Sequence, residues 1–357
     1  MARTEGPIVH RHALVVGATG VVGSAIARRL VANGDWTVTC ATRSGAAIDG
    51  AAGVSVDLLD EEAVAATAAA LAPVTHLFYA AYQSRPSRFE EVGPNAAMLR
   101  HAVALAEHHG RLERVVIVTG GKYYGVQWGA VRTPARETDA RHLAPNFYYD
   151  QLDYLAARRA SAAWTWANLM PATVTGVSVK APMNLVATLG VLGTLARETR
   201  RPLRFPGPPA SWHALHHLAD AGQIADAAAW AARSDRAADH SFNIANGDPG
   251  RWKHVWPRIA DFFGVEAGEP LPVPLTQIPE GFAGLWRELA TRHRLREPDI
   301  RALVDWRWAD YMFNTAFGND VVLETGKIRR AGFHACVDSE EALLDRLREL
   351  RALRLIP

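Results

Sequence analysis

The chain has 357 residues, which is enough to bury a large core and to form one composite domain or two. Its 39 basic and 37 acidic residues leave a net charge of +2, which excludes the strongly basic surface of a typical nucleic-acid-binding protein. A hydrophobic content of 49% with 21% charged residues is ordinary for a soluble globular protein.

The first residues and the cysteines indicate a cellular compartment. Residues 1–12 contain no apolar stretch of the kind found in signal peptides. The most apolar later segment, which begins at Asn184, is too short and too often interrupted by Gly and Thr to span a membrane. Cys40 falls in an apolar strand-like run, so a disulfide with Cys336 is not expected. We therefore expect a cytoplasmic protein with no membrane or nucleic-acid partner.

The first part of the chain alternates strand-like and helix-like segments. Runs of β-branched and other apolar residues predict strands at 12–18, 36–43, 53–59, 75–82 and 114–121. Helical spacing predicts helices between them, at 19–34, 61–72 and 95–110. Because the strands are apolar throughout and alternate with helices, we expect an α/β fold with a doubly wound parallel sheet of the Rossmann type.

Residues 122–147 are rich in turn-forming types and predict an active-site loop. A helix is expected at 148–161 and a further strand at 166–176, ending at a proline turn.

The remainder of the chain has a different composition. Tryptophan and proline become more frequent beyond residue 180, and most of the last hundred residues have amphipathic helical spacing. We predict a dinucleotide-binding core at 1–180 and a smaller, mainly helical substrate-binding cap at 181–357. A segment at about 210–246 is expected to return to the core.

A glycine motif predicts the cofactor. Gly17, Gly20 and Gly23, in "GATGVVG", follow the first strand and open the first helix. Glycines there permit a tight turn and close backbone approach, so that a pyrophosphate can sit on the helix N-terminus. The G-x-x-G-x-x-G spacing in this context predicts binding of a nicotinamide dinucleotide.

The end of the second strand favours NADPH over NADH. An NAD site usually has an acidic residue there, which accepts from the ribose 2′-hydroxyl. This strand ends instead in Thr42, Arg43 and Ser44, whose cation and hydroxyls suit a 2′-phosphate, although Arg43 as a solvated surface residue is the alternative. Asp57 stands where it can bind the adenine amino group, with a plain loop-capping role as the other interpretation.

Two adjacent tyrosines raise the question of the catalytic pair. Tyr148 and Tyr149 stand where short-chain reductases keep their tyrosine, but the fourth residue onward is Leu152 or Asp153 and not the usual lysine. Lys122 leaves the carboxyl end of the fifth strand, at the edge where open α/β sheets bind ligands. It could replace the missing lysine, or it could be a solvated loop residue.

Long motifs in the chain resemble one family. "TGGKYYG", "PNFYYDQLD" and "FNIANGDPGRWKHVWPRIADFFGVE" are similar to segments of the progesterone 5β-reductase and iridoid synthase family, and the resemblance runs from about residue 13 to the C-terminus. These are atypical extended short-chain reductases that reduce 1,4-enones. The resemblance implies that Lys122 and Tyr148 form the catalytic pair and that Tyr149 has a packing or supporting role.

The resemblance also implies a reaction. Hydride passes from NADPH to the β-carbon of an α,β-unsaturated carbonyl compound, and negative charge develops on the carbonyl oxygen. Tyr148 would hold that oxyanion, assisted by the charge of Lys122, and the enolate would take its proton from solvent. The expected partner is a small enone or enal; a homodimer is left open.

Besides the glycines and polar residues named above, the resemblance implies cofactor contacts for Thr19, Val21, Leu58, Ala81, Val118, Thr119, Lys122, Tyr148, Val174, Ala181, Pro182 and Met183. The substrate pocket is expected to contain Trp128, Tyr149, Thr173, Met183 and Trp308. The family's polar pair before the strand-end proline is replaced by Leu169 and Met170, and Thr173 stands where an asparagine is usual.

A metal site and two alternative functions are disfavoured by the sequence. His213, His216, His217 and Asp220 match no common zinc spacing, so no metal is expected. One alternative is an extended short-chain carbonyl reductase or a nucleotide-sugar epimerase, which the missing Y-x-x-x-K disfavours. Another is a non-catalytic NADP-binding redox sensor, which the presence of both Lys122 and Tyr148 disfavours.

Overall fold

The computed structural model describes residues 11–179 and 181–357. Residues 1–10, where we expect no signal peptide, and Lys180, at the predicted domain boundary, lie outside the described residues. No helix in the described part of the chain is long and apolar enough to cross a membrane.

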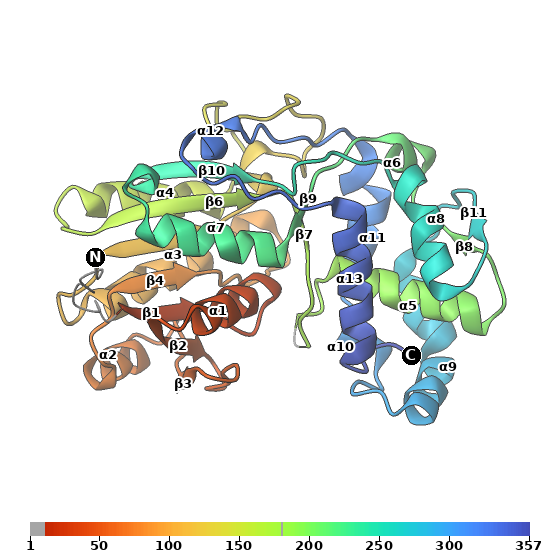
Figure 1. Cartoon of the computed structure of the whole chain (residues 1–357), viewed down its shortest axis with the longest axis horizontal. Coiled ribbons are helices and arrows are strands. Elements are labelled where there is room, and N and C mark those ends of the chain that lie inside the picture. The colour runs from red at the N-terminus through yellow and green to blue at the C-terminus, as the bar shows by residue number, and fades with distance from the viewer. Residues whose placement is uncertain (1–10, 180) are drawn as a thin grey trace, which may run out of the picture.

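A seven-stranded parallel sheet forms one half of the molecule (Figure 1). The strand order is β10-β6-β5-β4-β1-β2-β3, and every pair is parallel. The doubly wound Rossmann sheet is therefore confirmed. The strands are β1 (Arg11–Val16), β2 (Trp36–Thr42), β3 (Ala52–Ser55), β4 (His76–Tyr79), β5 (Arg114–Val118), β6 (Thr165–Pro171) and β10 (His240–Ile244).

Helices cover both faces of the sheet. On one face, α1 (Val21–Asn33) packs against α7 (Ala221–Arg233), whose buried side is mostly alanine and allows the two helices to approach closely. The other face is covered by α2 (Glu61–Ala70), α3 (Arg88–Glu107) and α4 (Phe147–Arg159). The central strands are thus buried on both sides, as their continuous apolar runs require.

Two predicted elements were wrong in their bounds. The helix expected to start at 95 begins at Arg88, because the Ser87 hydroxyl accepts from the backbone N–H of Glu90 and the helix continues through Pro94. The strand expected over 166–176 divides at Ala172. Its second part, β7 (Thr173–Thr175), leaves the main sheet and pairs with β9 (Leu218–Asp220).

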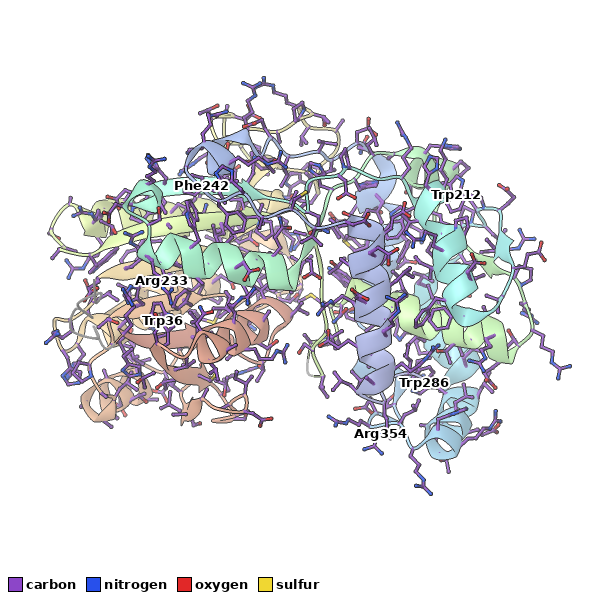
Figure 2. All side chains as sticks on the ribbon, viewed as in Figure 1. Trp36, Trp212, Arg233, Phe242, Trp286 and Arg354 are labelled. Carbon is purple, nitrogen blue, oxygen red and sulfur yellow. The ribbon has the colours of Figure 1, made fainter. Side chains whose placement is uncertain are left out.

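A helical unit forms the other half of the molecule (Figure 1). Its core contains several large aromatic side chains; Trp256 is fully buried and its indole N–H donates to the Leu203 carbonyl at 2.8 Å. Figure 2 places Trp212 and Trp286 in this half, and Trp36 and Phe242 beside the sheet. Its longer helices are α5 (Leu185–Glu198), α8 (Trp252–Phe263), α9 (Ile278–His293), α11 (Trp306–Asn314) and α13 (Ser339–Ala352).

Short elements complete the chain, namely β8 (Leu203–Arg204), α6 (Pro209–His213), β11 (Ala267–Gly268), α10 (Ile300–Leu303) and α12 (Gly326–Arg330). A mostly helical C-terminal portion is therefore present, as expected. The strand β10 and the helix α7 belong to the sheet half. We retain as a proposal the division into a core at 1–180 and a cap at 181–357, with 210–246 returning to the core.

Candidate active site

A cavity of about 550 Å³ lies at the carboxyl edge of the sheet. There β1 lies between β2 on one side and β4 on the other, which is the switch point where doubly wound sheets bind ligands. The loops after β1, β2, β3 and β4 line it, together with the start of α1, strand β7, the segment 181–184 and helix α11. Its walls include three of the chain's five methionines, Met98, Met183 and Met312.

The glycine turn forms one end of this cavity. Gly17 has φ +82°, and a β-carbon there would lie 2.7 Å from the Ala80 carbonyl oxygen. A β-carbon on Gly23 would lie 2.2 Å from the Gly17 carbonyl oxygen, so Gly23 serves the close packing of helix on turn and does not line the cavity. Gly20 begins α1 with no capping side chain and no acidic residue in the first turn. The unpaired amide groups of this helix end suit an anionic phosphate.

The loops after β2 and β3 form a second end. Arg43 is exposed, lines the cavity and has no ion pair among the described residues. The Thr42 hydroxyl donates to the Ala46 carbonyl at 3.1 Å, and Ser44 is exposed but does not line the cavity. Asp57 lines the cavity beside Leu58 while one of its oxygens accepts from the Leu59 N–H at 2.9 Å. Asp57 thus caps its own turn while facing the cavity.

Lys122 lies on a short 3₁₀ turn (Gly121–Tyr124) directly after β5. Its Nζ lies 4.9 Å from the centre of the Tyr82 ring, within cation–π range. Among the residues that the structure describes, the ammonium has neither a hydrogen-bond acceptor nor a carboxylate partner. Burial, and to a smaller extent the charge of Arg88, lower the pKa of Lys122 to about 8 against the opposing charge of Glu91. Lys122 is therefore a partly buried amine and not a solvated loop residue.

Tyr148 lies in the first turn of α4, partly buried, with its ring packed on Phe147. Its hydroxyl lies near Gly120, which has no side chain to cover it, and makes no hydrogen bond with the described residues. Burial, together with Tyr82 and Glu91, raises the pKa of Tyr148 above its ordinary value. The phenol is therefore a neutral donor with a free proton. Neither Tyr148 nor Lys122 lines the cavity itself; both stand beside Tyr82, which does.

Asn146 joins the two segments that carry these residues, a role that the sequence reasoning missed. It is 7% exposed; its amide nitrogen donates to the Lys122 carbonyl at 2.9 Å, and its amide oxygen accepts from the Tyr148 N–H at 3.1 Å. One side chain therefore caps α4 and ties its first turn to the end of β5. Asparagine before a helix is a recognisable cap in sequence, but the link to Lys122 is not.

The Asn146→Ala variant is expected to lower the free energy of unfolding by about 2 kcal/mol, because it removes a helix cap and a second buried hydrogen bond. Denaturant unfolding measures this change. The matched variant Asn146→Asp keeps the cap and loses the amide contacts with the Lys122 carbonyl and His142 Nε2, so we expect a smaller loss. Equal stability of Asn146→Ala and the parent protein would contradict the role as a tie.

Other expected site residues fall in two groups. Thr19, Val21, Ala81, Thr173, Val174, the stretch 181–183 and Trp308 line the cavity. Val118 and Thr119 lie at the end of β5 beside it, and the Thr119 hydroxyl is used within the sheet, donating to Asn168 at 2.9 Å.

Two residues expected in the substrate pocket lie elsewhere. Trp128 is 56% exposed on the loop after β5 and does not line the cavity. The Tyr149 hydroxyl donates to the Tyr123 carbonyl at 2.6 Å and accepts from the His142 N–H at 3.1 Å, so this side chain holds the loop that follows Lys122. The two adjacent tyrosines thus differ in their contacts, because the Tyr149 hydroxyl is hydrogen-bonded within the loop and the Tyr148 hydroxyl makes no hydrogen bond with the described residues.

Comparison with known families decides the relationship. A family model described as a PRISE-like Rossmann-fold domain matches residues 44–357. The chain belongs to this family. It is therefore a Rossmann-fold oxidoreductase, and membership implies a nicotinamide cofactor.

Relatives of the PRISE-like chain extend over almost its whole length. An (S)-8-oxocitronellyl enol synthase of Nepeta racemosa is 31% identical over 97% of this chain and 91% of the relative. A 3-oxo-Delta(4,5)-steroid 5-beta-reductase of Arabidopsis thaliana is 28% identical over 97% of this chain and 93% of the relative.

Solved structures share the fold of this PRISE-like protein at low identity. A UDP-glucose 4-epimerase of Thermotoga maritima has a TM-score of 0.68 at 15% identity, covering 96% of this chain and 99% of its own. A UDP-glucose 4-epimerase of Thermus thermophilus, solved with NAD, has a TM-score of 0.66 at 19% identity, covering 94% and 99%.

In the PRISE-like chain, two histidines after α6 form hydrogen bonds with backbone groups. The His216 Nε2 lies 3.0 Å from the Phe317 carbonyl, and the His217 Nδ1 accepts from the Leu323 N–H at 3.1 Å. Over residues 11–179 and 181–357, no group of three His, Cys, Asp or Glu side chains is placed to hold a metal ion.

Proposed function

We propose that the protein reduces the C=C bond of α,β-unsaturated carbonyl compounds with NADPH. The observation that carries the proposal is that a partly buried Lys122 at the end of β5 and a free-hydroxyl Tyr148 at the start of α4 both lie beside Tyr82. We propose that these two residues replace the Y-x-x-x-K arrangement of other short-chain reductases. Relatives named as an enol synthase and a steroid 5-beta-reductase support the same chemistry.

The cavity residues suit the cofactor. We assign the pyrophosphate to the uncapped start of α1, at Thr19, Gly20 and Val21, and the 2′-phosphate to Thr42 and Arg43. We assign the adenine to Asp57 and Leu58 and the nicotinamide side to Val174 and the stretch 181–183. When bound, NADPH supplies the hydride.

Residues of the chain then stabilise the negative charge that develops on the substrate. The Tyr148 hydroxyl donates a hydrogen bond to the substrate carbonyl oxygen, on which negative charge develops. A preorganised donor of this kind stabilises the transition state, and the Lys122 ammonium keeps the phenol a strong donor. The α-carbon of the enolate takes its proton from solvent, so no further acid is required.

Turnover of 2-cyclohexen-1-one tests the proposal. NADPH absorbance is followed, and the product is identified. Saturated ketone is the expected product. Allylic alcohol would instead assign ordinary carbonyl reduction, the activity that the epimerase-like fold would equally permit. NADPH binding without consumption on several enones would favour a redox sensor.

The Arg43→Ala variant is expected to raise the KM for NADPH by about ten- to a hundredfold, since a charge-assisted hydrogen bond to the 2′-phosphate is lost. The KM for NADH, which lacks that phosphate, should change little. Both constants are measured in the enone assay, with the exposed Arg100→Ala on α3 as control. An unchanged preference for NADPH would move its recognition away from Arg43.

A further inference from the structure

We propose that Tyr82 is a positioning residue that holds the Lys122 ammonium over its ring, and that Glu91 fixes Tyr82 in that orientation. The inference rests on the proposed function, because it concerns the lysine that we assign to the same site. It explains what keeps the ammonium in place although none of the described residues accepts a hydrogen bond from it.

Tyr82 lies between the two residues of the proposed catalytic pair. It comes from the segment between β4 and α3 and lines the cavity. One contact is with the Lys122 Nζ, 4.9 Å from the ring centre. Another is a stack on Phe147, with ring centres 5.6 Å apart and planes inclined by 23°. Since Phe147 directly precedes Tyr148, the Tyr82 ring contacts both the lysine and the start of the tyrosine helix.

Glu91 holds the far end of Tyr82. This carboxylate on α3 is only 2% exposed and accepts from the Tyr82 hydroxyl at 2.5 Å. Both of its oxygens also accept from Arg88 Nη1, at 3.0 and 3.1 Å. Because Arg88 and Tyr82 occupy the carboxylate, Glu91 does not form an ion pair with Lys122. The lysine therefore stays at the ring face and remains available to the site.

The face of an aromatic ring is better suited than a carboxylate to hold the Lys122 ammonium while leaving its N–H groups free. A direct ion pair would stabilise the ammonium strongly and draw it toward α3, whereas the ring quadrupole attracts the cation without fixing its N–H groups. The N–H donors of Lys122 then stay free for a ligand. The groups that act on Lys122 are Tyr82 and the Arg88 and Glu91 pair on α3, and Tyr148 on α4 lies beside the same three side chains. Beyond Arg88 lies Tyr311 on α11.

The composition of the chain makes Lys122 directly observable. There are only four lysines, Lys122, Lys180, Lys253 and Lys327. In protein labelled with ¹³C-lysine, the ε-carbon shift of each can be followed against pH by NMR, with Lys122→Arg identifying the signal. In the parent protein we expect this signal to titrate with a pKa of about 8.

The variants separate the ring from the carboxylate. Tyr82→Leu is expected to lower the pKa of Lys122 by roughly one unit, because the cation loses its ring face. Tyr82→Trp should restore it, since tryptophan is the strongest cation–π partner. Tyr154→Leu, a partly buried tyrosine on α4 away from Lys122, serves as control. Identical titration of Lys122 in Tyr82→Leu and the parent protein would overturn the proposal.

The acidic and basic partners should act with opposite sign. Glu91→Gln is expected to lower the pKa of Lys122 and Arg88→Gln to raise it, so the inference remains testable if Tyr82→Leu fails to fold. Shifts of equal sign in the two variants would contradict it. Enone turnover is measured separately. If the pKa of Lys122 changes in the variants as expected but no enone is turned over, only the proposed function is rejected. Turnover with no shift in any Tyr82 or Glu91 variant would reject only the positioning role.

Discussion

Tyr148→Phe is expected to lower kcat for enone reduction by about a hundred- to a thousandfold, because it removes the donor that meets the developing oxyanion. The melting temperature should change little, since the Tyr148 hydroxyl has no protein partner to lose among the described residues, and NADPH affinity should fall far less than kcat, since most of the assigned cofactor contacts lie elsewhere in the cavity. Absorbance kinetics, a binding titration with NADPH and thermal unfolding measure the three quantities.

The neighbouring tyrosines provide the comparison. Tyr154→Phe on the same helix should retain the activity of the parent protein. Tyr149→Phe removes the hydroxyl that donates to the Tyr123 carbonyl, so we expect it to lower the stability. It leaves in place the Tyr148 hydroxyl that is proposed to bind the substrate oxygen. If Tyr149→Phe abolished turnover while Tyr148→Phe retained it, the assignment of the two adjacent residues would be reversed.

Lys122→Ala is expected to lower kcat by about a hundredfold or more, because the phenol loses the cation that strengthens it as a donor. The same lysine predicts a pH dependence. Its ammonium is present below a pKa of about 8 and is lost as the pH rises through that value. Activity should therefore fall on the alkaline side near pH 8, and this limb should be absent from the residual activity of Lys122→Ala.

A matched substitution tests whether charge alone is needed. Lys122→Arg keeps the cation at every accessible pH, so its alkaline limb should disappear while part of the activity survives. An alkaline limb that remains in Lys122→Ala would belong to another group. Both outcomes are read from kcat/KM against pH with saturating NADPH.

Local patterns predicted much of the sheet and the glycine turn at one end of the cavity. The glycine turn is encoded within a few residues, since the close approaches at Gly17 and Gly23 leave no room for a side chain. The alternation of strands and helices is also a local pattern, and it predicted the parallel sheet. The helix α3 begins earlier than the spacing predicted, because Ser87 caps it and it continues through Pro94.

The polar support of the site could not be derived in this way. Asn146 meets Lys122 across a long loop, and Tyr82 meets it from another strand end, so neither contact has a spacing that a sequence pattern could reveal. Glu91 lies between the strand predicted at 75–82 and the helix predicted at 95–110, and a buried carboxylate is not expected from sequence alone. The family resemblance implied that Trp128 belongs to the substrate pocket, but its side chain is largely exposed and does not line the cavity.

The methionines of the cavity wall bear on which substrates the proposed reductase would accept. Met98, Met183 and Met312 line it from the sheet half, the segment before α5 and helix α11. Thioether side chains are unbranched and polarisable, so they adapt their shape to different apolar ligands at small cost. The glycine turn and the segment around Tyr82, by contrast, are held by close backbone packing and short hydrogen bonds. We expect promiscuity toward the hydrocarbon part of a substrate, combined with strict demands on its carbonyl end.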